Sequence, residues 1–138
     1  GDSEIVAWCS TNISGIPVNR FCEMRGYYDH QESMDRIADE VRNSAYEIIE
    51  KKHATYYGIA MSVVRICRAI VMNERSILPV SSIMHGEYGI DGIALSMPAI
   101  VGEEGFEVHV PIVLSEEEQK KLVASAEALR KVAKEAGL

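Results

Sequence analysis

The apolar positions of this chain follow a helical period in two segments that keep one polar side. Between residues 33 and 52, apolar residues recur every three or four positions and form a single stripe, typical of a helix with one covered face. Ser33 suits the N-cap of this helix. A second stripe, rich in small residues, runs through 115–136, where Ser115 and Glu118 match a capping box. Both segments are predicted to be amphipathic helices.

Residues 55–73 also have a helical period, but their apolar side chains occur on every side, and Arg65 and Arg68 carry the only charges. A helix of this kind is expected to be buried on most sides, covered by the helix at 33–52, by a sheet and by a further domain or subunit. Because a buried guanidinium group needs a partner, the two arginines are expected to form ion pairs or to lie at an interface.

Farther along the chain the apolar period changes to two. Residues 77–84, 93–101 and 106–114 alternate in this way and are separated by turn-rich segments, which predicts a three-stranded antiparallel meander. His109 occupies a solvent-facing position of the last strand in this pattern. A proline removes a ladder donor. We therefore expect bulges or edge positions at the three prolines of these strands, Pro79, Pro98 and Pro111.

Residues 1–32 lack a sustained period. The segment 5–8 is predicted to be a short strand, and 12–18, with turn residues between apolar ones, a strand–turn–strand unit or a loop. The order of loop, two helices, three strands and one helix places the chain in the α+β class. Its length suits one domain over residues 1–138.

Charge and composition narrow the function classes. The chain has 21 acidic and 14 basic side chains, a net charge of −7, so we expect no nucleic-acid-binding face, which needs clustered Lys and Arg. No apolar run approaches the roughly 18 residues of a membrane span. Free thiols in the cytoplasm are expected for the three cysteines, whose spacings are unrelated, at Cys9, Cys22 and Cys67.

Metal and nucleotide motifs are missing from the sequence. The four histidines have no metal-ligand spacing and are expected to be structural; they are His30, His53, His85 and His109. No Gly-rich phosphate loop is present, so no nucleotide-binding half is expected within this chain.

The segment around Thr55 is the most informative. Thr55 precedes the apolar helix and has two interpretations: an N-cap, which the residue pattern favours, or a hydroxyl that binds a carboxylate together with the helix N-terminus. Gly58 allows another backbone or a ligand to come close. Ile59 lies one helical turn beyond Thr55 on the same face, where it can press against a flat ring or belong to the core.

This segment is one of a series of motifs that occur in order along the whole chain. The series comprises Gly1-Asp2-Ser3-Glu4, Trp8-Cys9-Ser10, Gly15-Ile16-Pro17, the segments 44–52, 54–61 and 77–81, Gly86-Glu87-Tyr88-Gly89 and Leu95-Ser96-Met97-Pro98-Ala99. It resembles the C-terminal catalytic domain of bacterial L-lactate dehydrogenases, which interconvert pyruvate and L-lactate by hydride transfer with NAD.

The resemblance implies that Thr55 and Ala45 line the substrate pocket and that Ile59 packs against the nicotinamide ring. It also implies that the catalytic His stands immediately before Gly1, so that no catalytic residue lies in this chain. We therefore expect the chain to be inactive alone and to need an N-terminal NAD-binding Rossmann half, within a homodimer or homotetramer. His53 stands where the family usually has Gly, which is expected to alter the turn before the helix.

Two alternatives stay open. The first is a malate dehydrogenase of the lactate-dehydrogenase-like group, although that group usually has Ala and Pro at the positions of Thr55 and Ile59. The second is a non-catalytic assembly module, in which the apolar helix at 55–73 and the last helix would be binding faces.

Overall fold

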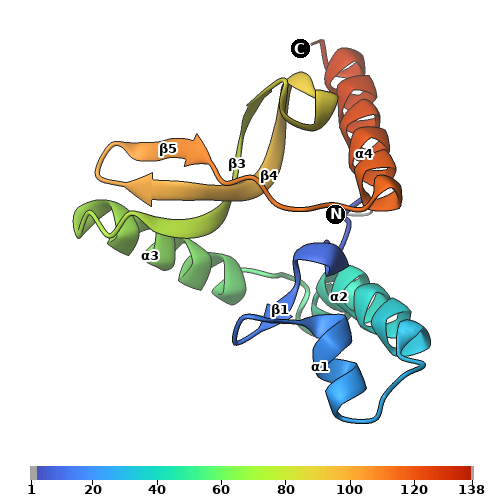
Figure 1. Cartoon of the computed structure of the whole chain (residues 1–138). Helices are drawn as coiled ribbons and strands as arrows, with labels where there is room; N and C mark the ends of the chain where they lie inside the picture. The colour runs from blue at the N-terminus through green and yellow to red at the C-terminus, as the bar shows by residue number, and fades with distance from the viewer. Residues whose placement is uncertain (1–2, 138) are drawn as a thin grey trace.

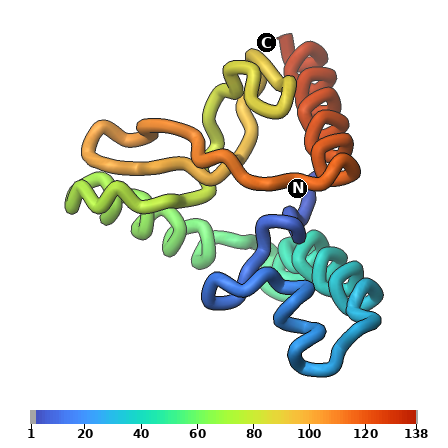
Figure 2. Tube along the Cα trace, in the orientation of Figure 1, coloured from blue at the N-terminus to red at the C-terminus, as the bar shows by residue number. Residues whose placement is uncertain are grey.

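The computed structural model of the chain describes residues 3–137 and has the predicted α+β architecture. The upper part of Figure 1 holds an antiparallel sheet with helix α4 (Glu116–Glu135) beside it, and the lower part holds the N-terminal segment and helix α2 (Gln31–Lys52). Helix α3 (Tyr57–Val71) leads from the lower part to the sheet and contacts β4. Figure 2 traces the short connection between α2 and α3.

The sheet is the predicted meander, in the strand order β3-β4-β5. Its elements are β3 (Ser76–His85), the turn helix η2 (Glu87–Gly89), β4 (Asp91–Gly102) and β5 (Gly105–His109). The third strand is shorter than the predicted 106–114, because the chain leaves the ladder after Val110 and crosses to α4.

Of the bulges or edge positions expected at the prolines, the structure has an edge position at Pro79, in the edge strand β3, and no bulge at Pro79 or Pro98. Pro79 pairs with Pro98 in register, and the Pro98 carbonyl accepts from the Val110 N–H at 2.8 Å, on the β5 side. The two prolines therefore form a pair that needs no ladder bond between them, and the missing N–H of Pro79 faces the open edge of β3. The register shifts occur elsewhere, after Ile83 and after Ile100.

The core lies between the sheet and α4 and consists of Met84, Ile90, Leu95, Met97, Leu122 and Ala126. Helix α4 begins at the predicted capping box: Ser115 Oγ accepts from the Glu118 N–H at 3.1 Å, and Glu118 Oε2 accepts from the Ser115 N–H at 2.7 Å. Glu118 Oε1 also accepts from the Cys9 N–H at 3.1 Å. This carboxylate therefore satisfies donors of the helix and ties the N-terminal segment to it.

The N-terminal segment departs from the prediction in two respects. The strand predicted at 5–8 is wrong, because these residues lead into a one-turn 3₁₀ helix, and the short helix α1 was not predicted. The strand–turn–strand unit at 12–18 is confirmed by an antiparallel pair. The elements of the segment are η1 (Trp8–Ser10), β1 (Asn12–Ile13), β2 (Ile16–Pro17) and α1 (Val18–Met24).

Helix α2 matches the predicted helix except at its start. Ser33 is not the N-cap; that position is taken by His30, whose side chain makes no cap bond. The His30 ring instead lies 3.2 Å from the Tyr27 carbonyl and 3.0 Å from Asn19 Oδ1. Within α2 only Met34 is buried, so most of the apolar stripe is uncovered.

Helix α3 differs most from the prediction. The expectation that it is buried on most sides is wrong for the described chain: Ala69 is the buried residue of α3, whereas Ile59 is 62% and Val64 58% exposed. The N-cap is Tyr56, so the interpretation of Thr55 as the cap is wrong as well. The helix is as apolar as the sequence indicated, but no other element between residues 3 and 137 covers its outer side.

Candidate functional site

The three residues predicted for the substrate and cofactor site line one cavity of about 540 Å³. Ala45 comes from α2, Thr55 from the connection between the helices, and Ile59 from the first turn of α3. Ala45 and Thr55 are separated in sequence by a helix end and a turn, so only the reversal of the chain brings them together.

The turn at His53 makes this reversal possible. The His53 N–H donates to the Ile49 carbonyl at 2.7 Å, and the backbone of His53 has a φ of 62°, in the left-handed region. Glycine adopts this conformation without steric cost, whereas a residue with a Cβ pays about 1 kcal/mol. The helix thus ends in the way a Gly would end it, and His53 carries the strain. The chain therefore reverses its direction at His53 as it would at Gly, and what His53 alters is the conformational energy of the turn.

The chemistry of the cavity suits a small organic anion next to an apolar surface. The N-terminus of α3 opens at the cavity, where unpaired backbone N–H groups and the helix dipole favour negative charge. Lys52 and the Thr55 hydroxyl belong to the same wall. Ile59 and Ile48 supply the apolar part. These groups can hold a carboxylate at one end and a flat ring at the other.

Among the residues that the structure describes, none that lines the cavity is a His, Asp or Glu, the groups most often used for proton transfer near neutral pH. Lys52 and two tyrosines are the ionisable side chains of this described lining. Of the motif Gly1-Asp2-Ser3-Glu4, the first two residues lie outside the described residues. The described part of the cavity wall therefore offers hydrogen-bonding and apolar groups.

A second polar cluster, on the sheet, was missed by the sequence analysis. His109 was expected to face solvent, but its side chain is only 9% exposed. Its Nε2 lies 2.6 Å from Ser82 Oγ, and its Nδ1 lies 2.9 Å from Glu87 Oε1. The bonds from the His109 ring and from two backbone N–H groups, at Glu87 and His85, lower the pKa of Glu87 to about 2.

The error at His109 has a local cause. Ile100 pairs with Val108, but the next residue of β4, Val101, pairs with Phe106, so one extra residue stands in β5 at Glu107. Such a bulge reverses the alternation of the strand. The side chains of Ser82, His109 and Glu87 thus form a series of polar contacts that connects β5 to β3 and to the turn helix η2. Glu87 and His109 line the adjacent cavity of about 320 Å³, whereas Ser82 does not.

The remaining expectations concern metals, thiols and membranes. Among the described residues, no group of His, Cys, Asp and Glu side chains could hold a metal ion. The three cysteines are free thiols, as expected. None of the helices within 3–137 combines the length and apolar character needed to cross a membrane.

The whole chain has close relatives among curated proteins. An L-lactate dehydrogenase of Acetivibrio thermocellus is 44% identical over 134 residues, which cover 97% of this chain and 42% of that protein. An L-lactate dehydrogenase of Bacillus velezensis is 43% identical over 132 residues, 96% of this chain and 41% of that protein. The chain therefore spans about two fifths of the length of these relatives.

Solved structures show the same fold. A minor L-lactate dehydrogenase from Enterococcus mundtii, in its ligand-bound form, superposes with a TM-score of 0.90 at 39% identity, covering 96% of this chain and 42% of that one. MGS-M5, a lactate dehydrogenase from a deep-sea metagenome library, has a TM-score of 0.91 at 38% identity and covers 100% and 44%. Residues 1–137 match the family described as lactate/malate dehydrogenase, alpha/beta C-terminal domain, and the chain belongs to that family.

Proposed function

We propose that this chain is the substrate-binding part of an NAD-dependent L-lactate dehydrogenase that interconverts pyruvate and L-lactate in the cytoplasm. The observation that carries the proposal is the single cavity that unites Ala45, Thr55 and Ile59. Two relatives that are 44% identical over 134 residues and 43% identical over 132 residues are named L-lactate dehydrogenases, which supports the same activity.

Each residue has a role that its position supports. The Thr55 hydroxyl and the N-terminus of α3 bind the polar end of pyruvate, and Ala45 leaves room for its methyl end. Ile59 presents an exposed aliphatic side chain at the cavity wall, a surface that fits one face of a nicotinamide ring. NAD, when bound, supplies the hydride acceptor; the chain's own residues bind and orient the substrate beside it.

The exposed side of α3 is where we expect the NAD-binding half to pack. Apolar residues are more than half exposed along the helix, among them Ile59, Met61, Val63 and Val64. Contiguous apolar surface of this kind marks an interaction site in a stable protein. The NAD-binding half and further copies of the enzyme, in a dimer or tetramer, are the proposed partners.

The direct test is pyruvate-dependent oxidation of NADH, followed by absorbance, with the chain alone and with the chain joined to its NAD-binding half. We expect no turnover from the chain alone and full turnover from the joined protein. Turnover by the chain alone would contradict the proposal. Oxaloacetate is the control substrate, and preference for it over pyruvate would assign the protein to the malate dehydrogenases of the same family.

A further inference from the structure

Helix α3 is anchored at the end that lies farthest from the cavity. Its buried residue, Ala69, is in the last turn, and the Glu74 N–H donates to the Ala69 carbonyl at 2.9 Å just beyond the helix. At the other end, Tyr57 is 73% and Ile59 is 62% exposed. The cavity end of α3 is therefore packed less tightly than its anchored end, and besides the anchor it is held by the short connection to α2.

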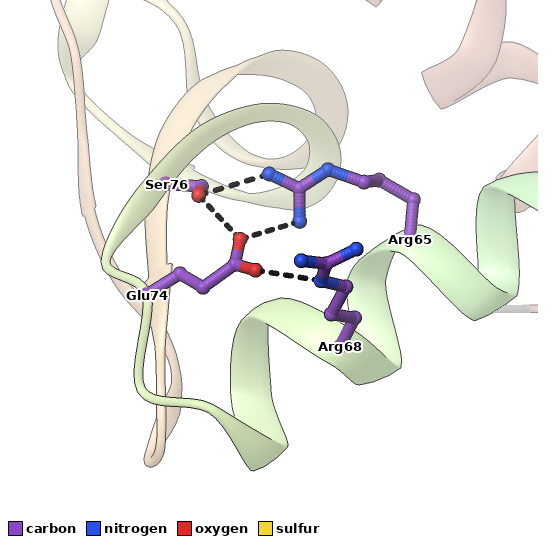
Figure 3. Close-up of polar contacts among 4 residues, drawn as sticks. All are labelled: Arg65, Arg68, Glu74 and Ser76. Atoms are coloured by element: carbon purple, nitrogen blue, oxygen red, sulfur yellow. Dashed lines mark hydrogen bonds and ion pairs between the residues drawn. The ribbon is translucent and has the colours of Figure 1, made fainter.

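A four-residue cluster makes the polar part of this anchor (Figure 3). Glu74 Oε2 accepts from Arg65 at 2.8 Å, and Glu74 Oε1 accepts from Arg68 Nε at 3.0 Å. The Ser76 hydroxyl donates to Glu74 Oε2 at 2.9 Å and accepts from Arg65 at 2.9 Å. The expectation that both arginines are paired is confirmed, although they lie near the surface rather than inside the protein.

Glu74 is the centre of the cluster. Its side chain is 24% exposed, against 44% for Arg65 and 72% for Arg68. The Ser76 hydroxyl and the Arg65 guanidinium lower the pKa of Glu74, which keeps the carboxylate ionised. Since Ser76 is the first residue of β3 and pairs with Val101 of the central strand, the carboxylate couples α3 directly to the sheet.

The length of α3 turns a small tilt at the anchor into a displacement at the cavity. A helix of 15 residues is about 22 Å long, so a tilt of roughly 3° moves its far end by about 1 Å. A misplacement of about 1 Å in a substrate site can lower the rate by two orders of magnitude. Thr55 and Ile59 lie at that far end.

We propose that Glu74 is a positioning residue for the substrate cavity: by holding Arg65, Arg68 and Ser76 together, it sets the orientation of α3 and so the places of Thr55 and Ile59. The proposal rests on the proposed function, because it assigns these two residues to substrate and cofactor binding. Its physical part, how firmly the cavity end of α3 is held, is measurable without turnover.

The test compares Glu74→Gln with Glu107→Gln in the whole enzyme, with the NAD-binding half present. Glu107 is a matched control: its side chain is 25% exposed and pairs at 2.7 Å with Arg75, which lies outside α3, so the pair ties the same junction to β5. Hydrogen–deuterium exchange of the backbone at 57–64 reports how firmly the cavity end of α3 is held, because amides exchange when local structure opens. Steady-state kinetics at saturating NADH give kcat and KM for pyruvate.

We expect Glu74→Gln to speed exchange at 57–64 and to raise KM for pyruvate about tenfold while lowering kcat, with Glu107→Gln within twofold of the unchanged enzyme. A purely structural role would lower Tm and the active fraction but leave KM alone, and that result would overturn the proposal. Equal effects of both variants would overturn it too. If the unchanged enzyme does not reduce pyruvate, the proposed function fails, and the exchange data still decide whether Glu74 holds the cavity end of α3 in place.

Discussion

The two halves of the molecule differ in how far their apolar side chains are buried. In the half made by the sheet and α4, Met84 is fully buried, and Met97 and Leu122 are 5% and 7% exposed. In the half made by α2 and α3, residues of the same kind, such as Met61 at 67%, face outward. The first half is stabilised by its own packing, whereas the second presents a site and a surface that other protein is proposed to complete.

The largest contrast is expected for truncations in the two halves. Met84→Ala removes a fully buried side chain and leaves a cavity, so the free energy of unfolding should fall by about 3 kcal/mol. Ile59→Ala, at a position that is 62% exposed, should cost less than about 1 kcal/mol in the same chain. Urea unfolding measures both, and equal losses would contradict the division into a packed half and an open half.

For catalytic activity, substitutions in the half made by α2 and α3 should have the larger effect. Thr55→Val keeps the shape of the side chain and removes its hydroxyl, so the joined enzyme should lose about tenfold or more in kcat/KM for pyruvate, with a free energy of unfolding unchanged within about 0.5 kcal/mol. Ser62→Ala is the control, since Ser62 lines the same cavity but donates its hydroxyl to the Gly58 carbonyl at 3.1 Å. Similar losses from both variants would argue against a substrate contact at Thr55.

The packed half should also respond to acid through Glu87. The pKa of Glu87 is about 2 in the folded protein, below its ordinary value of 4.5, because it accepts bonds from the His109 ring and from backbone N–H groups at Glu87 and His85. This stabilisation is therefore present above about pH 4.5 and is lost as the pH falls toward 2. Urea midpoints of the unchanged protein and of Glu87→Gln should converge over that window; a constant gap would refute the assignment.

The smallest expected effect is at the turn that forms the cavity. His53→Gly removes the left-handed strain but adds freedom to the unfolded chain, so the free energy of unfolding should rise by roughly 0.5 kcal/mol. His53→Ala is the control and should not stabilise, because it keeps a Cβ. A destabilised Gly variant would show that the His53 ring contributes contacts that outweigh the strain.

Local signals predicted most of the elements but few of their surroundings. The capping box at Ser115 and the stripe of α2 were readable because periodicity and capping act within a few residues. His109 was misplaced because one extra residue in β5 reverses the strand, and no feature of the segment announces it. Thr55 was assigned to a cap because Tyr56, one residue later, is an unusual N-cap.

The candidate site also has residues that the sequence identified and a residue whose proposed role only the structure indicates. The motif series alone pointed to Ala45, Thr55 and Ile59, and the structure adds that they share one cavity. Glu74 carried no signal in the sequence beyond the need of Arg65 and Arg68 for a partner. Its role depends on how the chain returns from α3 to β3, which a pattern of types and spacings does not contain.

The sequence by itself determined the helices α2, α3 and α4, the meander and the family, because these follow from short-range periods, caps and ordered motifs. The tertiary structure decided which apolar faces are covered, which way His109 points and how α3 is held over the cavity. These depend on contacts between residues far apart in the chain, where a one-residue shift or a missing neighbour changes the outcome while the local pattern stays the same.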